Sequence, residues 1–162
     1  MVDWDIVPIM NTMIDEKDRE ILTLLQKDAG QSIDAISEQV HLSRNACWRR
    51  IKTMEDTGII KARVAIVDPA RVGCPLSVMV LIRTNAHDQT WMEKFQSALR
   101  TLPEVVGAYR MTGDLDYVLR VRVADMPAYD AFYKRLIGKV SVSDISASFV
   151  MEEIKETTAV PL

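Results

Sequence analysis

Three helical patterns in close succession, between Ile14 and Gly58, constrain the fold more than any other feature of this sequence. The first runs from an expected N-cap at Asp15 to Lys27 and carries an apolar face of isoleucine and leucine. The second is short and is expected to begin after a cap at Ser32. A turn of about three residues separates it from the third, which is the spacing of a helix-turn-helix.

The third helix is expected to begin after Ser43 and to face the interior through Cys47, Ile51 and Met54. These positions follow the i, i+4, i+7 spacing of one helix face. The first two helices would form a small core that holds the third at the surface, where its polar face can enter the DNA major groove. The apolar residues of 59–66 then predict a strand or wing.

Charged residues are distributed unevenly along the chain, whose formal net charge is −3. Residues 44–63 carry six basic and two acidic side chains, a net charge of +4, whereas residues 67–162 carry 11 basic and 12 acidic side chains. A local basic stripe on a nearly neutral body is typical of a DNA-reading module, because the neutralisation of phosphates supplies most of the non-specific affinity.

The polar face of the third helix predicts individual DNA contacts. Arg44 and Asn45 lie in its first turn and suit guanine and adenine edges respectively. Trp48 can pack under the helix or lie against a sugar, and packing is the favoured interpretation. Phosphate contacts are expected from Ser43, Arg49, Arg50 and Lys52. A solvated charged face on an ordinary helix is the alternative. The full predicted DNA-binding set is Ser32, Ser43, Arg44, Asn45, Trp48, Arg49, Arg50 and Lys52.

The second half of the chain changes character after a linker rich in proline and glycine over 67–75. The run over 76–83 is apolar on both faces, which predicts a strand that is central in a sheet or lies in an interface. Further strands are predicted over 105–111, 117–123 and 145–154, and helices after expected caps at Asp88 and Asp125.

This element order, βαββαβ, is that of a ferredoxin-like domain. The sequence therefore predicts an α+β protein with an N-terminal winged helix-turn-helix and a C-terminal ferredoxin-like βαββαβ domain. The expected divisions are an N-terminal extension over 1–12, the DNA-binding domain over 13–66, the linker over 67–75, and the effector-binding and oligomerisation domain over 76–162.

The sequence contains no convincing catalytic set, metal site or phosphate-binding loop. Its two histidines lie in different predicted domains. Asp114 and Asp116 permit an acid–base pair, but a turn closed by an Asx-type hydrogen bond is the favoured interpretation. The acidic cluster at 152–156 is expected to be a solvated face. A small domain of this kind is more naturally a ligand-binding or oligomerising unit, so no enzyme activity and no cofactor are expected.

Cysteine usage and hydropathy restrict the cellular setting. Cys47 and Cys74 lie far apart without a CxxC pattern, so neither a disulfide framework nor a zinc cluster is expected. No apolar run approaches the ~20 residues of a membrane-spanning helix, and residues 1–11 lack the basic leader of a signal peptide. We expect a cytoplasmic protein with no membrane partner.

Four separated segments, in order, resemble the Lrp/AsnC (leucine-responsive/asparagine-responsive) family of transcriptional regulators. They are IDEKDREILTLLQKD, HLSRNACWRRIKTMEDTGIIKARVAIVDP, RMTGDLDYVLRVRVADMPAYDAFY and SFVMEEIKETT, and the likeness covers the chain from about Ile14 onward. The runs ACWRRIKTMEDTGI, YRMTGDLDYVLRV and ADMPAYDAFYKRL are similar to cysteine-responsive members of the family. Arg44 and Asn45 depart from the Pro and Thr that many members carry there, which implies a different preferred operator.

The resemblance implies a mechanism and a set of partners. The N-terminal module binds double-stranded DNA, the C-terminal domains pair into homodimers that often form octamers, and a small amino acid binds between dimers and alters assembly or DNA affinity. L-cysteine is the effector that the subgroup implies. The effector region carried over by motif is Met111, Thr112, Gly113, Asp114, Asp116 and Tyr117, with Met126, Ser148, Phe149 and Val150 nearby.

Two other functions remain open at this point. Sirohaem decarboxylases resemble the family in both halves, but they are expected to carry further His and Tyr residues, and this chain has only His41 and His87. A module that binds an effector and has lost DNA binding is the other possibility. The intact basic helix argues against it.

Overall fold

The computed structural model describes residues 14–86 and 88–162. The predicted extension over 1–12, with Met13, and His87 lie outside the described residues. The chain divides into two compact units. One comprises the residues up to Ala65 together with Lys155–Leu162, and the other comprises Ile66–Ile154. Each unit is described separately.

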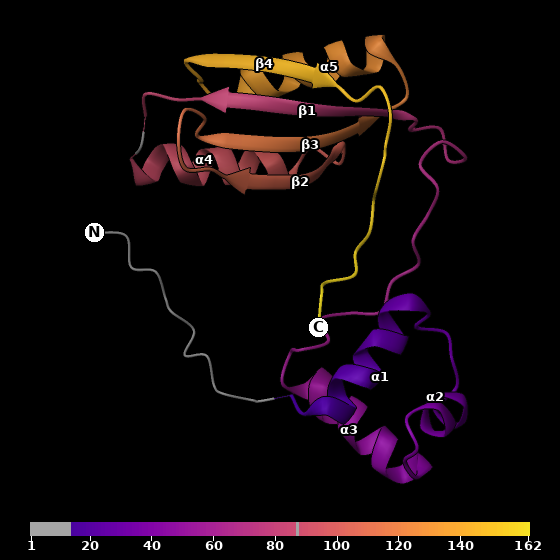
Figure 1. Cartoon of the computed structure of the whole chain (residues 1–162). Coiled ribbons are helices and arrows are strands. Elements are labelled where there is room, and N and C mark those ends of the chain that lie inside the picture. The colour runs from indigo at the N-terminus through magenta and orange to yellow at the C-terminus, as the bar shows by residue number, and fades with distance from the viewer. Residues whose placement is uncertain (1–13, 87) are drawn as a thin grey trace. The chain divides into compact units, whose positions relative to one another are not determined.

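The first unit contains the three helices that the sequence predicts, and their N-caps are confirmed. The side chains of Asp15, Ser32 and Ser43 each accept a hydrogen bond from a backbone N–H in the first turn of the helix that follows. Gly58, with φ of +76°, takes the left-handed conformation just beyond the end of the third helix. The helices are α1 (Glu16–Lys27), α2 (Ile33–Gln39) and α3 (Arg44–Asp56) (Figure 1).

The apolar faces of these helices form one small core. Cys47, Ile51 and Met54 are buried on α3, as their spacing predicts. The polar side of α3 is therefore left at the surface. The other buried members of this core are Ile21, Leu22, Ile36 and Val40.

The strand predicted over 59–66 is wrong, because residues 61–68 have no regular secondary structure. A strand needs a neighbouring backbone with which to exchange hydrogen bonds, and no strand within 14–86 or 88–162 pairs with this segment. The side chains of Val64 and Ile66 are consequently 74% and 78% exposed. Ile60 differs, since its N–H donates to the Met54 carbonyl and its side chain packs against the helical core.

The second unit is one antiparallel sheet with two helices, and it confirms the predicted βαββαβ order. The strands lie in the order β2-β3-β1-β4, so the chain order alternates hairpin and crossover in the ferredoxin-like manner. Figure 1 shows α4 and α5 against this sheet. The elements are β1 (Leu76–Arg83), α4 (Gln89–Arg100), β2 (Val105–Arg110), β3 (Tyr117–Val123), α5 (Met126–Lys139) and β4 (Asp144–Phe149).

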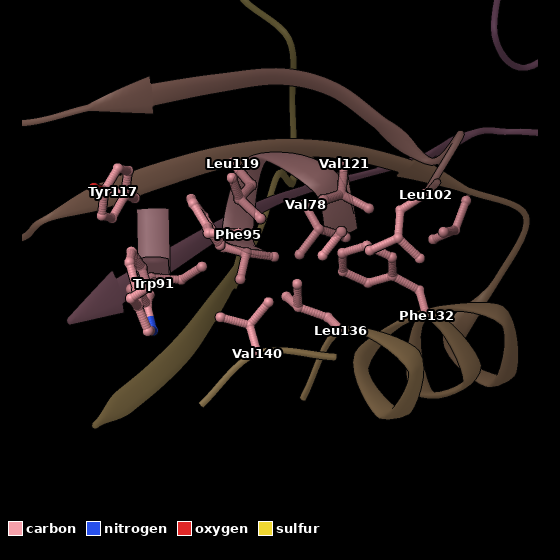
Figure 2. Packing of buried hydrophobic residues seen from close by; sticks show 14 residues of the cluster. Val78, Trp91, Phe95, Leu102, Tyr117, Leu119, Val121, Phe132, Leu136 and Val140 are labelled. Atoms are coloured by element: carbon pink, nitrogen blue, oxygen red, sulfur yellow. The ribbon is translucent and has the colours of Figure 1, made fainter. Parts of the chain in front are cut away.

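The core of this unit lies between the two helices and one face of the sheet (Figure 2). Val78, Val80 and Ile82 of β1 are fully buried there, and Met79 and Leu81 are half-buried on the opposite face. The doubly apolar β1 is thus a central strand, one of the two places that the pattern allowed. The labelled core residues are Val78, Trp91, Phe95, Leu102, Tyr117, Leu119, Val121, Phe132, Leu136 and Val140.

The last strand is shorter than predicted, since β4 ends at Phe149 and not at residue 154. The cause is the length of its neighbour. Phe149 lies opposite Val78, and the Val150 N–H donates to the Ser77 carbonyl, beyond which β1 has almost no backbone left to pair. Residues 150–162 therefore continue without regular secondary structure.

The segment Lys155–Leu162, which the sequence analysis assigned to the second domain, groups with the first unit. Its contact there is specific. The Gln26 side chain of α1 donates to the Val160 carbonyl at 3.1 Å and accepts from the Val160 N–H at 2.7 Å. A side-chain amide that satisfies both polar groups of one backbone residue fixes the chain as a sheet neighbour would.

Candidate DNA-binding surface and effector region

The first turn of α3 is organised by Ser43. Its Oγ accepts from the Ala46 N–H at 3.2 Å, and the Ser32 Oγ accepts in the same way from Ala35 at the start of α2. Both serines were predicted to lie at the DNA interface, and the structure gives each a capping hydrogen bond. An exposed N-terminal turn also presents backbone N–H groups, which attract anions.

The outer face of α3 presents a continuous polar and aromatic surface, called here the recognition face: Arg44, Asn45, Trp48, Arg49 and Lys52. Packing of Trp48 under the helix was the favoured interpretation and is wrong, since this side chain is 54% exposed. The inner side of the helix is already filled by Cys47, Ile51 and Met54. A large indole held at the surface beside arginines is suited to contact with sugars or base methyl groups.

The charges on the recognition face differ in how firmly they are held. Arg44 Nε lies 3.0 Å from Asp34 Oδ1, with both side chains more than half exposed. Lys52 donates to Asp56 at 2.8 Å, a hydrogen bond that raises the pKa of the lysine. Arg49 has no ion-pair partner within the described part of the chain. Arg49 is thus the cation of this face that is not paired with a carboxylate of the described residues. Exposed ion pairs such as that of Arg44 are weak and exchangeable.

Arg50 is separated from the recognition face, although it was predicted to contact phosphate with Arg49. Its Nη1 donates to Asp15 at 2.6 Å and to Asp18 at 2.9 Å, both on the N-terminus of α1. The hydrogen bonds to Asp18 and then Asp15 raise the pKa of the guanidinium. The pKa of Asp15 is lowered, chiefly by the hydrogen bond from the Asp18 N–H and next by Arg50.

The turn between β2 and β3 carries the first group of predicted effector residues. Gly113 has φ of +102°, a conformation that favours glycine. Asp116 closes the turn onto β1, because its Oδ2 accepts from the Thr84 N–H at 2.8 Å and its carbonyl accepts from the Met111 N–H at 2.8 Å. This supports the structural interpretation of Asp116 over an acid–base pair.

Asp114 is held differently in the same turn. Its carbonyl accepts from Arg83 Nε at 2.9 Å, while its carboxylate is exposed and has no partner among the described residues. Sequence reasoning missed Arg83 and Thr84 as supports of this turn. The polar residues that follow the apolar run of β1 were the available signal.

The predicted effector residues fall into two groups within one chain. The turn group lies at the end of β3 where Tyr117 pairs with Ile82, whereas Phe149 pairs with Val78 toward the other end of β1. Ile82 and Val78 are four positions apart on β1, which is about 13 Å at the rise of a β-strand. The second group is exposed Met126 together with Ser148–Val150, and Phe149 contacts the ring of Tyr129 edge-on at 5.2 Å between centroids.

The described cavities are shallow and mostly avoid these groups. One of about 550 Å³ lies between α1 and α2. Another of about 200 Å³ lies in the second unit and includes Val150, Ser77 and Arg122, but none of the turn residues. No group of three or more His, Cys, Asp or Glu suited to a metal ion occurs among residues 14–86 and 88–162. No helix in the same ranges is long and apolar enough to cross a membrane.

Family models match both units. Residues 14–61 match a winged helix-turn-helix DNA-binding model, and residues 77–160 match the Lrp/AsnC ligand binding domain. The DNA-binding transcriptional activator DecR of Escherichia coli (strain K12) is 46% identical over 151 residues, which cover 93% of this chain and 99% of that protein.

Solved structures agree in fold. An AsnC family transcriptional regulator from Agrobacterium tumefaciens superposes with a TM-score of 0.88 at 47% identity, covering 91% of this chain and 97% of that one. A transcriptional regulator from Neisseria meningitidis, solved as a complex with L-Met, gives a TM-score of 0.87 at 34% identity, covering 91% and 96%. All three of these proteins are regulators, which supports a regulatory function over the sirohaem decarboxylase alternative.

Proposed function

The chain belongs to the Lrp/AsnC family of DNA-binding transcriptional regulators, and on that basis we propose that its recognition face reads an operator in the major groove. The observation that carries this is the exposure of Arg44, Asn45 and Trp48 on a helix whose inner side is buried. Arg44 and Asn45 offer paired hydrogen bonds to base edges, and Trp48 offers apolar contact to a thymine methyl.

The proposal assigns phosphate contacts to Arg49 and Lys52. Arg49 has no competing carboxylate within the described residues, so the full positive charge of its guanidinium is available to attract a phosphate. The exposed Arg44–Asp34 pair is weak enough for DNA to displace. Because a DNA regulator acts where the chromosome lies, we place the protein in the cytoplasm.

The test is the salt dependence of DNA affinity for Arg49→Ala. Removing one phosphate contact should lower affinity for every duplex and reduce the slope of log affinity against log salt by about 1. Arg71→Ala is the matched control, because Arg71 is an exposed arginine of the second unit, 87% accessible at its side chain. Equal slopes for the wild type and both variants would refute the docking of α3.

For the second unit we propose an amino-acid effector site formed between copies of the chain. The turn group and the Phe149 group lie about 13 Å apart along one sheet, too far for one small amino acid to touch both. Two protomers can bring the turn of one copy to the Met126 and Phe149 region of another. Homodimers, with octamers as the larger assembly, would supply such contacts.

The chemistry of the turn favours a zwitterion. The free carboxylate of Asp114 can hold the ammonium group, and the backbone N–H groups near Gly113 can hold the carboxylate. L-cysteine is the first candidate on the sequence resemblance. The Neisseria meningitidis regulator in complex with L-Met is one relative that takes a sulfur-containing amino acid.

A thermal-shift screen against the amino acids, with L-cysteine included, tests this proposal. The true effector should raise the unfolding temperature and change the assembly size seen by light scattering. Asp114→Asn should abolish both responses and leave DNA binding intact. Asp116→Asn is the comparison, expected to weaken the fold of the turn. An undiminished response in Asp114→Asn would exclude this carboxylate as the anchor.

A further inference from the structure

Arg50 and two aspartates of α1 form a closed polar cluster, called here the α1–α3 clamp. Arg50 Nη1 lies 2.6 Å from Asp15 Oδ2 and 2.9 Å from Asp18 Oδ1. The side chain of Asp18 is only 16% exposed, and that of Arg50 is 32% exposed. The clamp therefore joins the recognition helix to the start of another helix more than thirty positions earlier in the chain.

Each carboxylate in the clamp divides its two oxygens between two tasks. Asp15 Oδ1 accepts from the Asp18 N–H at 2.9 Å, and Asp18 Oδ2 accepts from the Asp15 N–H at 3.1 Å, so the pair forms a capping box. The remaining oxygen of each accepts a hydrogen bond from Arg50 Nη1. The cap that starts α1 and the ion pair that holds α3 are thus one structure.

The charges of the clamp argue against a phosphate on Arg50. One guanidinium faces two carboxylates, a local charge of −1, so an approaching phosphate would meet net repulsion. Arg49, the next residue, has no such partner in the described chain. Neighbouring arginines of one helix therefore serve different purposes.

We propose that Arg50 is a positioning residue for DNA reading, which fixes the orientation of α3 on α1 through Asp15 and Asp18. This rests on the proposed docking of α3 and goes beyond it, because it makes operator binding depend on two acidic residues. Acidic side chains near DNA ordinarily oppose binding. Here their removal weakens the reading of the operator.

The variants Asp15→Asn and Asp18→Asn separate the clamp from the cap. Asparagine keeps an amide oxygen for the capping hydrogen bond and is a good N-cap residue, but its NH₂ group cannot accept from Arg50. Each variant should lose about three- to tenfold in affinity for an operator selected from random duplexes with the wild-type protein, the scale of one partly buried ion pair.

Asp34→Asn is the matched control, because it also removes an aspartate paired with an arginine of α3. It should leave operator affinity unchanged or raise it, since Arg44 is freed and a negative charge is lost. A scrambled duplex of the same composition gives the second readout. The clamp variants should bind it within about twofold of wild type with an unchanged salt slope, because their phosphate contacts remain.

The double variant Arg50→Gln/Asp18→Asn completes the test. If Arg50 acts through the aspartate, the double variant should lose no more operator affinity than Arg50→Gln alone. If Arg50 contacts phosphate, Asp18→Asn should tighten binding, and Arg50→Gln should weaken binding to both duplexes and lower the salt slope. That pattern would overturn the proposal. Failure of the Arg49→Ala test would instead refute the docking of α3 itself.

Discussion

At the scale of single residues, the neighbours of a charge decide its use. Arg44, Arg49 and Arg50 lie within two turns of one helix. Arg44 faces one exposed carboxylate, Arg50 faces two, of which that of Asp18 is partly buried, and Arg49 faces none among the described residues. The sequence shows three similar cations, because the partners of Arg50 are adjacent only after α1 and α3 have packed.

The depressed pKa of Asp15 predicts an acid-sensitive stability. The folded state favours the ionised carboxylate through the Asp18 N–H and then Arg50. Its contribution is therefore present above the ordinary aspartate pKa of about 4 and is lost as pH falls through the lower folded value.

Thermal unfolding between pH 6 and pH 3 would check this expectation for the wild type and Asp15→Asn. The variant should lose less stability on acidification than the wild type does. Asp34→Asn, which leaves the clamp intact, should follow the wild type. An Asp15→Asn curve parallel to that of the wild type would contradict the assignment.

At the scale of elements, local signals predicted where helices begin, and partners decided where strands end. The caps at Asp15, Ser32, Ser43, Asp88 and Asp125 are all confirmed, because a cap is a hydrogen bond within one turn. The strand predicted over 59–66 and the end of β4 were wrong, because strand length depends on a neighbouring backbone. The prediction that Trp48 packs under α3 was wrong for a related reason. Periodicity does not show which side of a helix is already filled by other side chains.

Ser43 offers a separation of helix stability from DNA affinity. Ser43→Ala removes the cap of α3 and should cost about 1 kcal/mol of unfolding free energy. Ser43→Asp keeps a capping oxygen and should retain the stability, yet it places a negative charge in the turn that approaches DNA.

Chemical denaturation and DNA titration on the same preparations would distinguish the two effects. Ser43→Asp should be as stable as the wild type and bind DNA at least tenfold more weakly at low salt. Wild-type affinity in Ser43→Asp would show that this turn stays away from phosphates.

At the scale of the whole molecule, two separate cores predict two separate stabilities. The helical core and the sheet core share no buried residue. Cys47 is fully buried in the first, where burial raises the pKa of its thiol, and Cys74 is partly exposed beside the start of β1. Sequence position suggested that both thiols are free, but not that only one is sheltered.

Alkylation rates of the two thiols should therefore differ. The thiolate is the reactive form, so the native protein should react quickly at Cys74 and slowly at Cys47. Cys74→Ser and Cys47→Ala isolate one thiol each, and mass spectrometry follows the label. Denaturant should bring the two rates together. Equal rates in the native state would mean that the helical unit is open.

The hydrogen bonds between Gln26 and Val160 have a consequence for biosynthesis. Translation proceeds from the N-terminus, and early domains generally fold as they emerge from the ribosome. Here the DNA-binding unit takes in Lys155–Leu162, so its last piece is made only after the whole sheet domain. A nascent chain can form α1, α2 and α3 early, but it acquires the complete reading unit only once the other unit has been synthesised.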